Sequence, residues 1–68
     1  LLPHSTLSDR EYQVLCKLGS GTSVKDTAAE LGLSPKTVST YRTRVLSKMN
    51  LKSNAELIRY VLRHGLVD

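Results

Sequence analysis

The chain has few of the residues that covalent or metal chemistry requires. Its 68 residues include one cysteine, two histidines, no tryptophan and no phenylalanine. Cys16 alone cannot form an internal disulfide or a thiolate zinc cluster, so we expect it to be a small buried side chain of a helix. His4 and His64 have no neighbours at metal-ligand spacing. We therefore expect no catalytic residues, no metal site, no cofactor and no enzyme.

Long apolar runs and strand patterns are also missing. No apolar run approaches the roughly 18 residues that cross a bilayer, nothing resembles a secretory leader, and no segment alternates with a period of two. A chain of 68 residues forms one small domain with a modest core. We expect an all-α protein that resides in the cytoplasm and does not contact a membrane.

Acidic residues are absent from the middle of the chain. Residues 31–55 contain five basic and no acidic side chains, whereas the other 43 residues contain five basic and six acidic ones. The net charge of +4 is therefore local. A local basic surface attracts polyanions, DNA above all. Charge alone fits a solvated positive face equally well.

Four amphipathic helix patterns follow one another, each after a serine that can cap it. They predict helices at about 9–19, 24–31, 35–49 and 54–64, within a folded domain at 7–68 that follows the end of a linker at 1–6. Three of the serines have a carboxylate three residues later, the capping-box spacing, at Ser8 and Glu11, Ser23 and Asp26, and Ser53 and Glu56. The expected inward positions are Tyr12, Val14, Leu15, Leu18, Val24, Ala28, Leu31, Val38, Tyr41, Val45 and Met49.

The second and third helices are joined by a short turn that contains Gly32. Ser34 can cap the third helix, and Pro35 suits its first turn. This arrangement predicts a helix-turn-helix unit, in which the third helix is the recognition helix and enters the major groove.

The surface of the third helix carries short hydroxyls between basic side chains. Its residues outside the apolar stripe include Lys36, Ser39, Thr40, Thr43 and Arg44. Serine and threonine hydroxyls read base edges at close range, whereas lysine and arginine at the flanks suit phosphates. We expect phosphate contacts from Lys36, Arg42, Lys48 and Lys52, and Arg44 fits either role.

The fourth helix has an apolar stripe that is wider than one core needs. Leu57 and Val61 lie beside Ile58 and Leu62. Either the whole stripe packs on the first three helices, or an edge that includes Asn54, Leu57 and Val61 pairs with a second subunit. The alternative to DNA binding is a helical protein-interaction or dimerisation module that uses this helix and binds no DNA.

Several ordered motifs resemble one known family. Segments 7–11, 21–26, 28–31 and 37–41 are similar to the LuxR/FixJ-type helix-turn-helix domain, the C-terminal effector domain of NarL/FixJ response regulators. The segment from Lys36 to Arg44 is most similar to the BvgA-type branch. The chain departs from the family pattern at Gly19, where alanine is common, and at Thr27, where a branched apolar residue is common.

The resemblance implies a role for particular residues and partners. Sequence-specific binding of double-stranded DNA is expected, with base-reading positions at Ser39, Thr40 and Thr43 and backbone contacts at Lys36, Tyr41 or Arg42, and Lys48. It also implies a homodimer through the fourth helix, which begins at Ser53, on paired half-sites. A receiver domain is expected upstream, and the location is the bacterial cytoplasm, at the nucleoid.

Overall fold

The fold consists of four α-helices and one short 3-10 helix. The computed structural model describes residues 2–67, so Leu1 and Asp68, the outer ends of the expected ranges 1–6 and 7–68, lie outside the described residues. The elements are η1 (Pro3–Thr6), α1 (Asp9–Gly19), α2 (Val24–Leu31), α3 (Pro35–Met49) and α4 (Asn54–Arg63). No strand occurs in residues 2–67. The all-α fold is thus confirmed, although α4 ends one residue before the expected bound at 64.

A serine begins each α-helix by accepting a hydrogen bond from the backbone N–H three residues later. Only Ser8 forms the full capping box, because the Glu11 carboxylate accepts the Ser8 N–H in return. The boxes expected at the second and fourth helices are incomplete. The side chain of Asp26 is one methylene shorter and makes no such bond, and the Glu56 carboxylate accepts instead from the N–H of Lys52.

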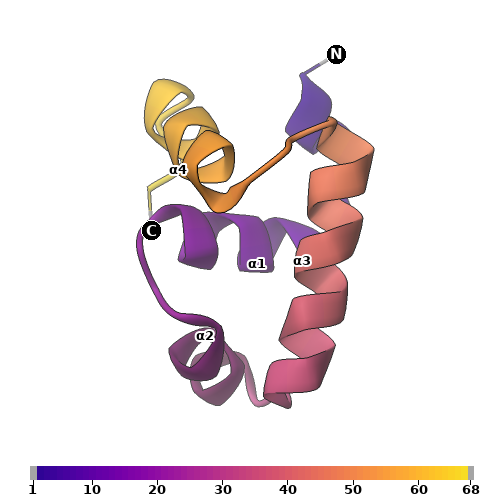
Figure 1. Cartoon of the computed structure of the whole chain (residues 1–68), viewed down its shortest axis with the longest axis vertical. Coiled ribbons are helices and arrows are strands. Elements are labelled where there is room, and N and C mark those ends of the chain that lie inside the picture. The colour runs from indigo at the N-terminus through magenta and orange to yellow at the C-terminus, as the bar shows by residue number, and fades with distance from the viewer. Residues whose placement is uncertain (1, 68) are drawn as a thin grey trace.

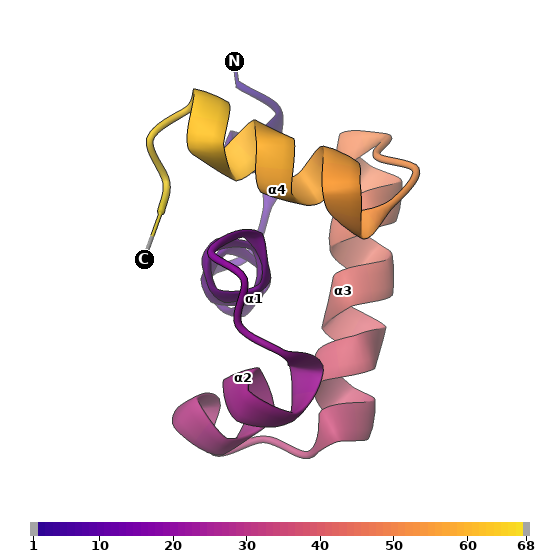
Figure 2. The ribbon, with the colours of Figure 1, turned by 60° about the vertical axis from the view of Figure 1, so that its left-hand side comes forward.

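Helix α1 lies at the centre of the molecule. In Figure 1 it passes between α4 and α2, and α3 runs along one side of all three. Figure 2 shows α1 nearly end-on, with α4 and α2 on opposite sides of it. The most extensive packing is that of α1 against α4 and α3, followed by α2 against α3. No helix within residues 2–67 combines the length and the apolar character that crossing a bilayer needs.

One apolar cluster holds the four helices together. Each helix contributes from the stripe that its periodicity predicts, and the buried members are Val14, Leu15, Leu18, Ala28, Val38, Val45, Met49, Leu57 and Val61. Four expected inward residues differ, and two of them, Val24 and Leu31, are half-buried against the cluster. Tyr12 is exposed on the rim of α1, and Tyr41 is half-buried. The phenol of Tyr12 lies beside the Cys16 thiol, which raises the pKa of the tyrosine above its usual value.

Helices α1 and α4 approach each other closely at Gly19. A Cβ built at this position would lie 2.6 Å from Cβ of Val61, so the crossing leaves no room for a side chain. The alanine that is common at this position in the family would therefore collide with α4.

The turn between α2 and α3 sets the angle of the helix-turn-helix. Gly32 has a left-handed backbone (φ 67°, ψ 34°), and the N–H of Leu33 donates to the carbonyl of Ala28. This is a Schellman ending, which favours glycine because it has no Cβ. Ser34 then caps α3 through the N–H of Thr37. The chain therefore turns into α3 within three residues.

The N-terminal segment packs on the domain, although the sequence predicts only an irregular linker end. Residues Pro3–Thr6 form η1, which contacts α3. The N–H of His4 donates to the hydroxyl of Tyr60 (3.3 Å), and that hydroxyl lies 2.6 Å from Nδ1 of His4. The Tyr60 ring also stacks on His64. His4 and His64, which lie far apart in the sequence, therefore meet on Tyr60.

Candidate nucleic-acid interface

Helix α3 leaves one long face uncovered. Val38, Val45 and Met49 point into the core, and α2 packs against α3 as the first helix of a helix-turn-helix does. The three expected base-reading residues, Ser39, Thr40 and Thr43, are all exposed. The structure therefore brings the short hydroxyls together on one open surface.

Two of these hydroxyls bond to the helix itself. Oγ1 of Thr40 donates to the carbonyl of Lys36, and Oγ1 of Thr43 donates to the carbonyl of Ser39, each at 3.1 Å. Such bonds to the preceding turn occupy the hydroxyl proton and leave the oxygen lone pairs as acceptors. The threonine side chains thus have defined orientations before any ligand is present.

Basic side chains surround this hydroxyl face. Lys36 and Arg44 are exposed, and the Arg44 guanidinium lies 5.8 Å from the centre of the Tyr41 ring. Lys52 is exposed and donates to Oδ1 of Asn50 (3.3 Å). The positive groups expected at phosphates therefore flank the hydroxyls at both ends of α3.

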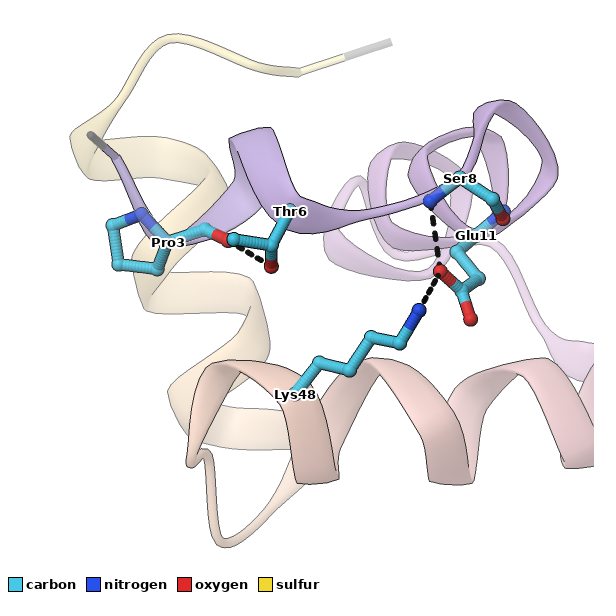
Figure 3. A network of polar contacts seen from close by, with 5 residues as sticks. All are labelled: Pro3, Thr6, Ser8, Glu11 and Lys48. Carbon is cyan, nitrogen blue, oxygen red and sulfur yellow. Dashed lines mark hydrogen bonds and ion pairs between the residues drawn. The ribbon is translucent and has the colours of Figure 1, made fainter.

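Lys48 has a structural partner that the sequence did not reveal. Its ammonium lies 2.8 Å from Oε1 of Glu11, and Figure 3 shows it reaching from α3 to the start of α1. Glu11 is only 3% exposed. The hydrogen bond from Lys48 lowers the pKa of the Glu11 carboxyl most, and the Ser8 N–H adds to this effect against the opposing cost of burial. The capping-box spacing predicts the bond to Ser8, but no local pattern predicts a partner 37 residues away.

Arg42 is also held by a residue from another helix. Its Nε donates to Oδ1 of Asn54, the first residue of α4, at 2.7 Å. The sequence predicts a phosphate contact for Arg42 and a contact with a second subunit for Asn54, which are two separate surfaces. In the folded chain they are in direct contact.

The predicted dimer edge requires a correction. Leu57 and Val61 are 1% and 0% exposed because they fill the core between α4 and α1, so they cannot present a surface to a second subunit. The large apolar residues of α4 that are exposed are Ile58 (36%) and Leu62 (63%). Each exposed residue directly follows a buried one in the sequence, so the exposed pair lies one position further along α4 than the predicted pair. Ser53 and Asn54 remain exposed at the start of α4.

Comparison with known proteins identifies this arrangement. Residues 5–61 match the family described as bacterial regulatory proteins, luxR family. The chain belongs to the luxR family. Membership confirms the expected DNA-binding domain of a transcription regulator with its helix-turn-helix.

Similar proteins carry the domain as part of a longer chain. Over 66 residues, 97% of this chain, it is 42% identical to the response regulator UvrY of Escherichia coli K12 and 41% identical to the response regulator GacA of Pseudomonas aeruginosa PAO1. It is 46% identical over 59 residues, 87% of this chain, to the transcriptional regulatory protein TdiR of Thauera aromatica. The aligned parts span 30%, 31% and 26% of those proteins. No solved structure matches the chain at a significant level.

Proposed function

We propose that this domain reads DNA by inserting α3 into the major groove. Ser39, Thr40 and Thr43 face the bases, and the phosphate contacts come from the basic and aromatic side chains around them, namely Lys36, Tyr41, Arg42, Arg44, Lys48 and Lys52. The observation that carries the proposal is the exposed hydroxyl face between cations on the second helix of a helix-turn-helix.

The character of the recognition face sets the kind of specificity. The hydroxyls of Thr40 and Thr43 already donate to backbone carbonyls, so they accept from base donors, and a threonine methyl can contact the methyl of thymine. Because these side chains are short, α3 has to approach the bases closely. Discrimination is softer than that of an arginine–guanine pair, and sequence-dependent DNA shape contributes to site choice.

A second copy of the chain is the proposed protein partner. Asn54, Ile58 and Leu62 follow one another at four-residue spacing and therefore lie on one ridge of α4. This ridge, with Ser53 at its start, takes the place of the edge through Leu57 and Val61. Two domains that meet along it would place their recognition helices on paired half-sites.

The similar proteins suggest what precedes this domain in a longer chain and where that chain acts. UvrY and GacA are response regulators, so we propose that a receiver domain precedes this domain and that the protein acts in the bacterial cytoplasm at the nucleoid.

A salt titration tests the proposal. Duplexes are first selected from a random library, and binding of labelled selected sites is then measured by fluorescence anisotropy at several salt concentrations. The logarithm of the binding constant should fall linearly with the logarithm of salt concentration, by about 0.9 for each phosphate contacted. Binding that is absent even at low salt would leave the protein-interaction module as the function of α4.

Two matched variants separate base reading from phosphate binding. Thr43→Ala should change the order of preference among selected sites, because it removes a group at the base edges. Lys36→Ala should weaken all sites alike and reduce the salt slope by about one. Lys36 suits this control better than Lys48, because Lys48 also forms the ion pair with the buried Glu11. Equal losses across all sites for both variants would contradict the division of roles.

A further inference from the structure

The contact between Arg42 and Asn54 joins the recognition helix to α4. The bond is 2.7 Å long, and the residues are twelve positions apart in the chain. Asn54 sits in the first turn of a helix whose Leu57 and Val61 are buried in the core. The backbone of Asn54 is therefore held in place, and this limits where its side-chain Oδ1 can lie.

The bond fixes the guanidinium but leaves most of its donors available. A guanidinium is planar and carries five N–H groups, one on Nε and four on the two terminal nitrogens. Fixing the Nε–H fixes the plane of the group. The four terminal N–H donors of Arg42 have no partner among residues 2–67.

The partner is neutral, which preserves the charge of Arg42. Lys48 provides the contrast, since its ammonium is paired with the Glu11 carboxylate. An amide oxygen accepts one hydrogen bond without supplying a negative charge. Arg42 therefore keeps a full positive charge and a fixed plane, both of which bidentate phosphate binding favours.

We propose that Asn54 is a positioning residue that holds the Arg42 side chain ready for a DNA phosphate. The inference rests on the proposed function, because it takes Arg42 as a phosphate contact. Asn54 then acts on DNA through Arg42. The position of α4 thereby affects a contact with the DNA backbone, made by the residue next to the base-reading Thr43.

A double-mutant cycle on a duplex with a single half-site tests the inference, because one bound domain makes no contact along the α4 ridge that also contains Asn54. Arg42→Ala should lower the affinity and reduce the salt slope by about one. Asn54→Ala should weaken binding by about threefold to tenfold, the effect of ordering one long side chain, with the salt slope nearly unchanged. In the Arg42→Ala background, and in the Arg42→Lys background, which lacks the Nε donor, Asn54→Ala should have no further effect. Asn54→Asp should weaken binding at least as much as Asn54→Ala. The carboxylate keeps the hydrogen bond, but its negative charge offsets the positive charge that the Arg42 guanidinium would present to a phosphate.

The possible results distinguish a failure of the inference about Asn54 from a failure of the proposed DNA binding. If Asn54→Ala costs the same affinity with and without Arg42, or costs none, Asn54 does not position Arg42 and the inference is wrong. If Arg42→Ala leaves both affinity and slope unchanged while the duplex still binds, Arg42 is not a phosphate contact, and the inference fails although DNA binding stands. Loss of all binding in the unsubstituted domain would overturn the proposed function itself. Thermal unfolding of each variant checks that these changes do not come from loss of the fold.

Discussion

At the scale of single residues, the most unusual side chain is Thr27. It is fully buried in α2, and its Oγ1 is the one buried side-chain polar atom among residues 2–67 without a hydrogen-bond partner. A buried hydroxyl that lacks a partner loses its hydration without compensation. The departure from the family's branched apolar residue, noted in the sequence, therefore has an energetic consequence.

Thr27→Val should stabilise the domain by about 1 kcal/mol, because valine has nearly the same shape and no hydroxyl to desolvate. Chemical denaturation of both proteins measures the difference. Thr27→Ser is the matched control, since it keeps the hydroxyl and loses a methyl group; it should destabilise by about 1 kcal/mol. A Thr27→Val protein no more stable than the parent would show that the hydroxyl is satisfied in solution.

At the scale of elements, the crossing of α1 and α4 depends on the missing side chain of Gly19. Alanine favours a helix over glycine by about 1 kcal/mol, yet a Cβ at this site would meet the branched side chain of Val61. Overpacking of this kind costs about 1–3 kcal/mol. The contact between helices, rather than propensity within α1, decides the outcome.

Gly19→Ala should therefore lower the midpoint of thermal unfolding, measured by circular dichroism. In a Val61→Ala background the same substitution should cost less, because the two methyl groups of Val61 are gone, although Cβ of residue 61 remains close and keeps part of the cost. If Gly19→Ala raised the midpoint in both backgrounds, α4 would have to sit farther from α1 than it does in this structure.

At the scale of the whole molecule, the ion pair between Glu11 and Lys48 links stability to pH. The pKa of Glu11 is lowered below its ordinary 4.5 in the folded chain, chiefly by the Lys48 ammonium. A carboxyl with a depressed folded pKa stabilises the fold at pH values above the unfolded pKa. That stabilisation is lost as the pH falls through the lower, folded value.

Unfolding midpoints of the parent and of Glu11→Gln, measured from pH 7 down to pH 3, test this linkage. The parent should be the more stable protein at neutral pH, and the difference between the two should shrink at pH values below 4.5. Other carboxyls titrate in both proteins and so cancel in the difference. A difference that stays constant over the whole range would mean that Glu11 does not contribute to the linkage.

The sequence predicts the positions of the helices better than the side-chain contacts between them. Serine caps, Gly32 and the apolar stripes are local signals, so helix positions follow from spacing. The choice between Leu57 and Ile58 as the outward residue depends on where α1 lies, which the period of α4 alone does not specify. The contacts of Glu11 with Lys48 and of Arg42 with Asn54 join positions 37 and 12 residues apart, and charge or hydroxyl patterns carry no information about them.

The central position of α1 also has a consequence for how the domain forms during synthesis. Helices α1, α2 and α3 leave the ribosome first, but the face of α1 opposite α2 is covered only when α4 arrives (Figure 2). Val14 and Leu15 are fully buried in the finished domain, and Leu57 and Val61 of α4 belong to the same cluster. In a domain this small, the three-helix nascent chain has too little core to be stable alone. Folding of this domain therefore waits until α4 has been translated, and a chain truncated before Val61 should be degraded by proteases.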